Sequence, residues 1–394
     1  MDYAFGPEDE AFRQEARAWL TEHAIGEPAR AAGRSWEREL GADGWIGLGW
    51  SPARGTYGNR TATSTGQVVW AEEYARAQAP ARLGHLGENL LAPTLIAHGD
   101  EAQCARFLPA IARGEELWCQ GYSEPGAGSD LAAVRTAAVR AAGGRTYRIS
   151  GQKIWTSLAH EADWCFLLAR STEGSRRHHG LSFLLVPMDQ PGRIEVRPIR
   201  QMSGSADFNE VFFDGAEARA GHLVGGEGNG WRVAMGLLAR ERGVSTLVQQ
   251  IGFAAELTQV IRLAIESGAA AEPAVRDRLV RQWADLQAMR WNALRTLGTA
   301  DDPGAPSFDP GAPSVAKLLW GGWHKRLGEL AMQVRGAPAA LGPDDWHADR
   351  PYRLDALQRL FLFSRADTIY GGSDEIQRNI IAERVLGLPK EPRP

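Results

Sequence analysis

The spacing of hydrophobic residues changes twice along the chain. From residue 8 to about residue 116, apolar residues recur at helical spacing, as at Phe12, Ala16 and Leu20, which predicts an all-helical N-terminal domain over residues 1–117. Beyond this point short β-type runs alternate with Gly, Pro and Asp turns. These runs predict a central β-domain over residues 118–224, with strands at 164–168, 181–186 and 211–213.

The third stretch is helical again. Residues 231–271 contain no proline and place apolar residues at i, i+3, i+4 and i+7, which predicts one long helix or two in line. A Pro/Gly-rich connection at residues 301–313 separates them from further helical segments around 315–334 and 351–386. Several long helices indicate a bundle over residues 225–394, so we expect an α+β fold.

Composition and charge exclude some classes of function. Of the 394 residues, 44% are hydrophobic and 23% are charged, and the net charge is -4. These values are ordinary for a globular protein, and a net negative charge offers no basic field to nucleic acid. The sequence shows no secretory leader and no apolar run of the ~18 residues that a membrane span needs. We therefore expect a cytoplasmic protein that binds neither nucleic acid nor membrane.

Neither cysteine nor histidine spacing indicates a metal site. Cys104, Cys119 and Cys165 are too far apart for a disulfide framework or a ligand cluster, and we expect buried thiols. His178 and His179 are adjacent, so they cannot face one metal from a helix, and a solvated loop is the simpler interpretation. No metal is predicted.

A glycine-rich loop is the first candidate for binding chemistry. Residues 124–130 read Glu-Pro-Gly-Ala-Gly-Ser-Asp, and such residues permit positive φ and let backbone N–H groups approach an anion such as a pyrophosphate. A plain turn is the alternative. Downstream, residues 151–157 form a turn followed by a strand in which Trp155 could cover a flavin ring while Ser157 bonds its edge. The alternative for Trp155 is a core aromatic.

Residues 122–130 and 151–157, in this order and spacing, resemble the flavin-binding segments of the acyl-CoA dehydrogenase family. The resemblance continues through residues 196–199, 208–214 and 376–387 and covers almost the whole chain. It implies an N-terminal helical domain, a β-barrel-like central domain and a C-terminal four-helix bundle, with FAD between the last two. The flavin contacts that it implies are Tyr122, Ser123, Gly128, Ser129, Trp155 and Ser157, with Ser373 and Glu375 as weaker candidates.

The catalytic base is expected in an unusual place. Many members of the family carry a Glu directly after the Tyr of a segment similar to residues 370–373, but here that position is Gly371. Glu241 interrupts an apolar helical stripe, so its carboxylate must be paired, protonated or facing a ligand cavity. An ion pair with a neighbouring Arg is the structural alternative. A minority branch of the family keeps its base at this helix position, which favours Glu241.

The resemblance implies α,β-dehydrogenation of an acyl thioester, on CoA or on a carrier protein, to the trans-2-enoyl thioester. Glu241 would remove the α-proton, flavin N5 would accept the β-hydride, and an electron-transfer flavoprotein would take the electrons. The N–H of Gly371 and the flavin ribityl hydroxyl would bind the carbonyl oxygen, with Arg242 organising the charge. Asp374 and Glu375 are alternative bases, although the sequence after Ser373 is also typical of a helix N-cap, which we prefer.

The chain departs from the family at the segment that, in homotetrameric relatives, binds the adenine half of the FAD of a neighbouring subunit. Homotetrameric relatives carry an Arg followed by Gln-Phe-Gly there, whereas residues 272–283 here lack it. The chain resembles a bacterial branch that acts on steroid side chains, pimeloyl-CoA and other bulky acyl groups, in which two homologous chains often pair. We therefore expect an oligomer, and a hetero-oligomer in particular. An oxygen-using flavoenzyme, either an acyl-CoA oxidase or a flavin monooxygenase, and a catalytically silent partner subunit remain alternatives.

Overall fold

A computed structural model describes residues 5–24, 33–51, 55–240, 244–300, 311–342 and 354–390. The chain divides into two compact units. The first combines residues 6–200 with 206–242, and the second combines residues 243–394 with the short segments 1–5 and 201–205. The N-terminal helices and the β-sheet therefore belong to one unit.

The first unit begins with helices packed around aromatic side chains. Helix α5 starts where Asp100 and Gln103 cap each other's backbone N–H groups. The rings of Trp45 and Trp70 stack at 4.3 Å, and the buried carboxylate of Glu73 pairs with three arginines of this domain. The helices are α1 (Pro7–His23), α2 (Gly33–Ala42), α3 (Ser64–Arg76), the π-helical turn η3 (Gly87–Leu91), α4 (Ala92–His98) and α5 (Glu101–Ala112).

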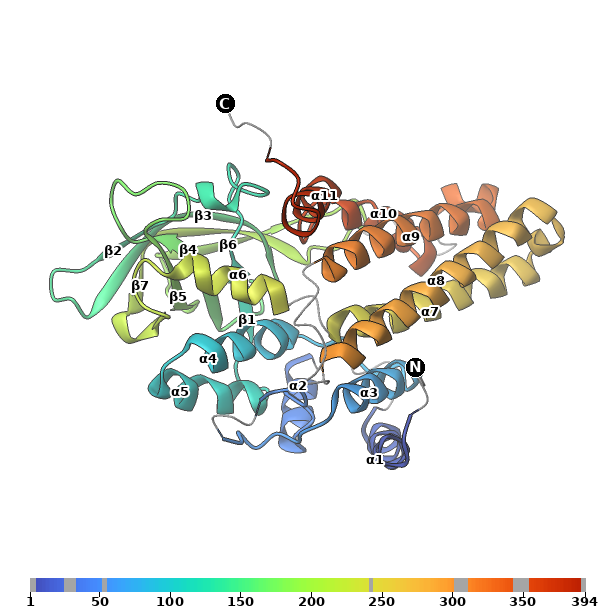
Figure 1. Cartoon of the computed structure of the whole chain (residues 1–394), viewed down its shortest axis with the longest axis horizontal. Helices are drawn as coiled ribbons and strands as arrows, with labels where there is room; N and C mark the ends of the chain where they lie inside the picture. The colour runs from blue at the N-terminus through green and yellow to red at the C-terminus, as the bar shows by residue number, and fades with distance from the viewer. Residues whose placement is uncertain are drawn as a thin grey trace. The chain divides into compact units, whose positions relative to one another are not determined.

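An eight-stranded sheet completes the first unit, with strand order β6-β7-β3-β2-β4-β5-β8 and β1 paired to β4 (Figure 1). Apolar side chains of β4 and β5 are buried along nearly their whole length, as the continuous hydrophobic runs require. The strands are β1 (Trp118–Gly121), β2 (Ala137–Arg140), β3 (Thr146–Ser157), β4 (Trp164–Arg170), β5 (Leu181–Pro187), β6 (Ile194–Ile199), β7 (Phe208–Arg219) and β8 (Leu223–Val224).

Helix α6 (Gly230–Arg240) lies against this sheet and against the N-terminal helices. It packs on β4 and β5 and on η3 and α4, and its Val233, Ala234 and Leu237 belong to the same hydrophobic core as Leu90. The helix can begin this close to β5 because residue 230 is glycine. A Cβ there would lie 2.5 Å from the Ser182 Cα.

The second unit is a bundle of long helices. Helices α7, α8 and α9 pack side by side (Figure 1) around a core that includes Phe253, Leu257, Trp323 and Leu327. Shorter segments follow and pack on α9. The elements are α7 (Val244–Glu266), α8 (Pro273–Ala300), α9 (Ala312–Arg335), α10 (Ala356–Phe363), the 3-10 turn η8 (Ala366–Thr368), α11 (Asp374–Ile380) and the π-helical turn η9 (Ile381–Val385).

The structure confirms the expected helical, β and helical order of elements, including strands at all three predicted runs. The segment 231–271 forms two main helices, α6 and α7, of which α6 belongs to the unit that contains the sheet. Most of the connection 301–313 lies outside the described residues, and α9 begins at Ala312. In the described part of the chain, every helix is too short or too polar to cross a membrane.

Candidate functional site

The glycine loop follows β1 as a tight turn. Glu124 and Ala127 exchange both main-chain hydrogen bonds at 3.0 Å, and Ala127 is buried while Gly126 and Gly128 are exposed. Neither of these two glycines adopts a positive φ, so the loop does not use the left-handed backbone that glycine permits. A Cβ added to either would meet nothing within 4 Å. Their contribution is to leave the loop backbone uncovered, as an anion or cofactor at this surface would require.

A buried ion pair supports this loop from below. Lys153 is fully buried, and its ammonium donates to Glu124 Oε1 at 2.8 Å, to the Leu168 carbonyl at 2.8 Å and to the Tyr122 carbonyl at 3.0 Å. All three ammonium donors are thereby used. The Lys153 side chain therefore connects the segment before the loop, the loop itself, β3 and β4.

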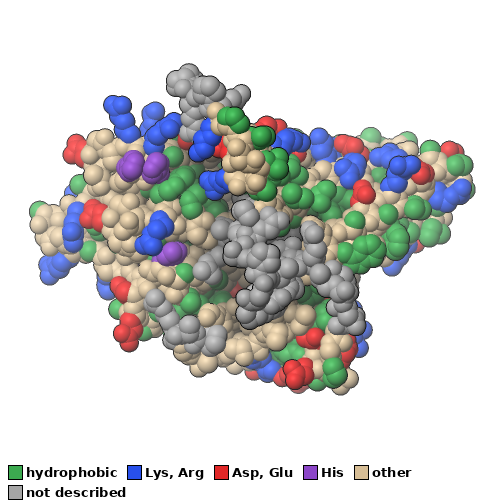
Figure 2. Space-filling model, viewed as in Figure 1, with side chains coloured by type: hydrophobic (Ala, Val, Ile, Leu, Met, Phe, Trp, Pro, Cys, Tyr) green, Lys and Arg blue, Asp and Glu red, His purple; other side chains and the backbone are tan. Residues whose placement is uncertain are grey.

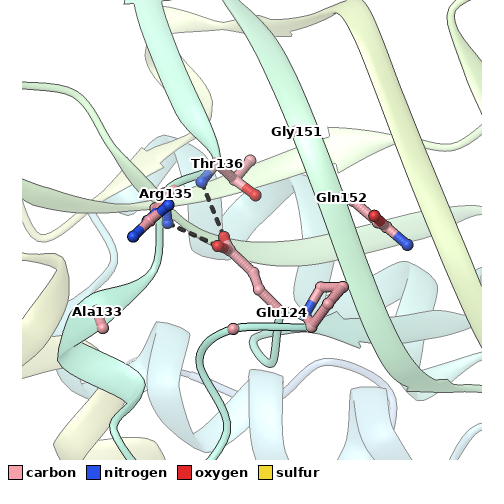
Figure 3. A pocket seen from close by; sticks show the side chains of 8 residues that line it. Glu124, Ala133, Arg135, Thr136, Gly151 and Gln152 are labelled. Atoms are coloured by element: carbon pink, nitrogen blue, oxygen red, sulfur yellow. Dashed lines mark hydrogen bonds between the residues drawn. The ribbon is translucent and has the colours of Figure 1, made fainter.

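The Glu124 carboxylate has hydrogen-bond partners for both of its oxygens. Its carboxylate also accepts the main-chain N–H groups of Arg135 at 2.6 Å and Thr136 at 2.8 Å (Figure 3). Burial alone would raise the pKa of Glu124, but the charge and hydrogen bond of Lys153 and these N–H donors lower it below its usual value. Burial lowers the pKa of Lys153, and the charge and hydrogen bond of Glu124 oppose that shift.

A small pocket of about 300 Å³ opens beside the loop. It is lined by Glu124, Pro125 and Gly126 on one side, by the segment that leads into β2, and by Gly151 and Gln152 of β3 (Figure 3). The amide of Gln152 points toward β7, where it donates to Glu210 at 2.9 Å. The pocket lies next to the exposed face of the glycine loop.

Trp155 is held in a strained and exposed position. The pairing of β3 with β7 slips by one residue between Lys153 and Thr156, and in this bulge Trp155 has a φ of 61° and remains 57% exposed. Asn209, which is fully buried, donates to the Thr156 carbonyl at 3.0 Å and holds the bulge in place. A bulky residue at positive φ is rare and concentrates at functional sites. The core alternative for Trp155 is therefore wrong.

The other expected flavin contacts of this unit lie around the loop and the bulge. The Tyr122 ring is buried edge-on against Phe166 and Phe183, so only its main chain is at hand for a ligand. The Ser123 carbonyl accepts the Ile154 N–H at 2.9 Å, which brings the loop segment beside the Trp155 strand. Ser129 is exposed and Ser157 is half-buried.

Gly371, Ser373 and Glu375 belong to the second unit. Gly371 and Gly372 have φ values of 64° and 84°, and both of their carbonyls accept the side-chain amide of Gln377. The Ser373 hydroxyl caps α11 by accepting the Ile376 N–H at 3.5 Å, which confirms the N-cap interpretation. The pKa of the exposed Glu375 is lowered by backbone N–H and Ser373 hydrogen bonds, so Glu375 is poorly suited to be a base.

Glu241 and Arg242 lie outside the described residues. Helix α6 ends at Arg240 and α7 begins at Val244. Of the apolar stripe expected around Glu241, only the side chain of Leu237 is described, and it is fully buried.

Sequence reasoning missed the residues that support the site. Lys153 had a detectable signal, because it is a charged residue at an inward-facing position of a predicted strand. Asn209 had none, since its function depends on how β7 pairs with β3. In the described part of the chain, no cluster of three metal-binding side chains is present.

Comparison with known proteins gives a consistent result over the whole length. The acyl-CoA dehydrogenase N-terminal, middle and C-terminal domains match residues 6–115, 119–216 and 228–386. Acyl-CoA dehydrogenase IpdE1 of Mycobacterium tuberculosis is 52% identical to this chain, covering 97% of it and 98% of that protein. The IpdE1 protein of Mycolicibacterium smegmatis is 51% identical, covering 98% and 99%.

Two solved structures share the fold along the full chain. The Tcur3481-Tcur3483 steroid ACAD superposes with a TM-score of 0.85 at 27% identity, covering 99% of this chain and 100% of that one. The ChsE4-ChsE5 complex from Mycobacterium tuberculosis gives a TM-score of 0.81 at 30% identity, with the same coverage.

The buried ion pair makes a prediction about stability. We expect Lys153→Met to lower the free energy of unfolding by about 3–5 kcal/mol, because the Glu124 carboxylate then stays buried without its cation. Adding Glu124→Gln should recover part of that loss. Urea unfolding followed by tryptophan fluorescence measures both. Lys390→Met is the control, since its ammonium is exposed, and equal stabilities for the two Lys variants would contradict the prediction.

Proposed function

The chain belongs to the acyl-CoA dehydrogenase family and is an oxidoreductase, and from that premise we propose that it uses FAD to dehydrogenate an acyl thioester to the trans-2-enoyl thioester. The observation that carries the proposal is the exposed, strained Trp155 beside an uncovered glycine loop. Strain of this kind persists only where the surrounding structure fixes it. Here Lys153 and Asn209 provide that surrounding structure.

The residues of the first unit fit a flavin. The Trp155 indole offers a flat apolar face of the kind that stacks on an aromatic ring system. Gly128 and Ser129 present exposed backbone and a hydroxyl, the donors that suit a pyrophosphate. Ser157 would bond the ring edge, with Ser123 and the Tyr122 main chain beside it. When bound, FAD supplies the hydride acceptor.

Proton removal from the α-carbon is assigned to Glu241. The N-cap geometry at Ser373 and the lowered pKa of Glu375 argue against the bases near residue 371. In the sequence Glu241 comes directly after α6, and this helix packs on the sheet and on η3, which supports the proposal. Arg242 would organise the charge there. An α-proton of a thioester becomes acidic only when fixed donors meet the charge that forms on the carbonyl oxygen.

Gly371 is assigned to that carbonyl oxygen. Its position is exposed, it carries no side chain, and its carbonyl is tied down by Gln377. No side chain of its own covers the N–H, and Gln377 holds the turn that carries it. The absence of a side chain also leaves room for a bulky acyl group, and we propose a CoA thioester of a steroid-derived acid. Support comes from the 27% identical relative described as a steroid ACAD.

We also propose a homologous second chain as partner and an electron-transfer flavoprotein as the electron acceptor. The helix α8 carries Val280, Trp283 and Trp291 on one face, each more than half exposed, and Figure 2 shows apolar side chains between the charged ones on the long helices. Large apolar side chains exposed together on one face of a long helix are typical of an interface. Both structural relatives described above are named as pairs of different chains.

The base can be tested directly. We expect Glu241→Gln to lower the rate of flavin reduction by an acyl-CoA about 10²–10⁴-fold, the usual contribution of a general base, with flavin content unchanged. Stopped-flow absorbance at the flavin band measures it. Glu266→Gln, an exposed carboxylate on α7, is the matched control. Turnover that survives in Glu241→Gln would favour the flavin monooxygenase alternative, because a monooxygenase needs no such base.

Trp155 can be tested apart from catalysis. Trp155→Ala should lower the affinity for FAD about tenfold or more, since an aromatic stacking face is worth ~0.5–1.5 kcal/mol beyond its buried area. Its thermal stability should change little because the ring is exposed. Trp155→Phe should restore most of the binding, and Leu341→Ala, another exposed apolar side chain, should have no effect. Titration of the apoprotein with FAD gives the affinities, and unchanged binding in Trp155→Ala would contradict the stacking.

Flavin occupancy tests whether a homologous partner chain is needed to bind FAD. We expect this chain, purified alone, to hold clearly less than one FAD per chain, because the adenine-binding segment of homotetrameric relatives is missing from residues 272–283. Co-expression with a homologous partner should raise occupancy. Absorbance spectra against protein concentration, together with light scattering, measure both. Full occupancy in a pure homo-oligomer would contradict the hetero-oligomer and also the silent-subunit alternative.

A further inference from the structure

A buried charged cluster lies inside the second unit, just before Gly371. His324 of α9 is placed between two carboxylates, with Nε2 2.8 Å from Glu256 Oε2 of α7 and Nδ1 in hydrogen-bond contact with Asp367 Oδ2 of η8. Asp367 is 1% exposed and His324 is 6% exposed. The cluster is part of no flavin or base assignment above.

The geometry fixes the protonation state of His324. An ionised carboxylate only accepts hydrogen bonds, so both ring nitrogens must carry hydrogen, which makes the ring an imidazolium. Burial alone would lower the pKa of His324, but the hydrogen bonds and charges of Asp367 and Glu256 raise it to about 9. Among the described residues, these two carboxylates are the charged groups that pair with the ring, and Phe253 packs on it with ring centres 4.4 Å apart.

Asp367 also holds the segment that follows it in the sequence. Its other carboxylate oxygen accepts the Tyr370 hydroxyl at 2.7 Å, and its main-chain carbonyl accepts the buried Lys317 ammonium. That ammonium also lies 4.8 Å from the centre of the Tyr370 ring. Helix α9 approaches closely here because residue 321 is glycine, where a Cβ would lie 3.1 Å from the Asp367 carbonyl oxygen.

These contacts hold the chain as far as Tyr370, the residue before Gly371. The Tyr370 N–H donates to the Ala366 carbonyl at 3.0 Å, and Gln377 binds the carbonyls on the far side of the turn. Gly371 has no side chain with which to fix itself. The orientation of its N–H therefore depends on contacts of the residues on either side.

We propose that His324, Asp367 and Tyr370 form a charged clamp that positions the Gly371 N–H toward the thioester carbonyl oxygen. The inference rests on the proposed function of Gly371. All three are positioning residues, because they act through the turn. The clamp needs His324 as a cation, since the neutral ring can donate to only one of the two carboxylates.

The sign of the pH dependence follows from the raised pKa. The stabilisation that His324 provides is fully present below about pH 6.5, the ordinary pKa of histidine, and is lost as the pH rises through about 9. A His324→Gln variant should therefore differ from the natural protein at pH 7 and resemble it at pH 10.

Hydrogen exchange of the full-length protein, read by mass spectrometry, tests the clamp without turnover. We expect residues 366–373 to exchange about tenfold faster in His324→Gln than in the natural protein at pH 7, and the ratio to approach one at pH 10. Peptides of β4 and β5 report that the variant is folded. Arg326→Gln removes a cation from the same helix at an exposed ion pair and should leave the segment unchanged. A ratio of one at pH 7, or a ratio independent of pH, would overturn the clamp.

Flavin reduction by an acyl-CoA in the flavin-loaded enzyme tests the positioning. His324→Gln and Tyr370→Phe should lower the limiting rate about 10- to 100-fold without changing flavin content, and Tyr370→Phe serves if His324→Gln folds poorly. Faster exchange with an unchanged rate would overturn the positioning function. A natural enzyme whose flavin is not reduced by any acyl-CoA would contradict the proposed function instead, while the exchange ratio still decides on the clamp.

Discussion

The ion pair between Lys153 and Glu124 is the contact on which the rest of the candidate site depends. A buried ammonium and a buried carboxylate are costly unless every hydrogen-bonding position is used, and here both groups are fully engaged. The consequence is geometric. The glycine loop, the entry to β2, the bulged strand β3 and β4 are tied to one point, so the exposed loop can stay uncovered without becoming disordered.

The strain at Trp155 is a consequence of the same frame. The residue lies two positions after Lys153, and the backbone on its other side is held by Asn209 through the Thr156 carbonyl. Two buried polar groups therefore fix the ends of the bulge, and the chain between them has no freedom to relax its positive φ. Positive φ at a bulky residue costs ~1–3 kcal/mol, a cost that a well-packed sheet of this size can offset. The result is an indole held outside the core in one orientation.

Sequence reasoning reached the order of elements because hydrophobic periodicity is a local property, and it found the strands at 164–168 and 181–186 for that reason. It placed Trp155 and the glycine loop in the site only through the family resemblance. The bulge at Trp155 depends on pairing with β7, more than fifty residues away, and the contact of His324 with Asp367 joins residues 43 positions apart. Neither leaves a local signal. The glycines of the loop permit positive φ, but Gly126 and Gly128 do not adopt it, and a side chain at either position would point into open space.

The surroundings of position 371 explain why this residue is a glycine. Its φ of 64° is strained for any residue with a side chain. A Cβ there would lie 3.8 Å from Cε of the buried Lys317, so a glutamate would lie within range of an ammonium. That cation would lower the pKa of the glutamate, whereas a base for a weakly acidic carbon needs a pKa near the working pH. A carboxylate at 371 would thus bind Lys317 and disturb the Asp367 carbonyl that Lys317 now holds. A glycine at this turn avoids that contact and leaves the hydrogen bond from Lys317 to the Asp367 carbonyl undisturbed.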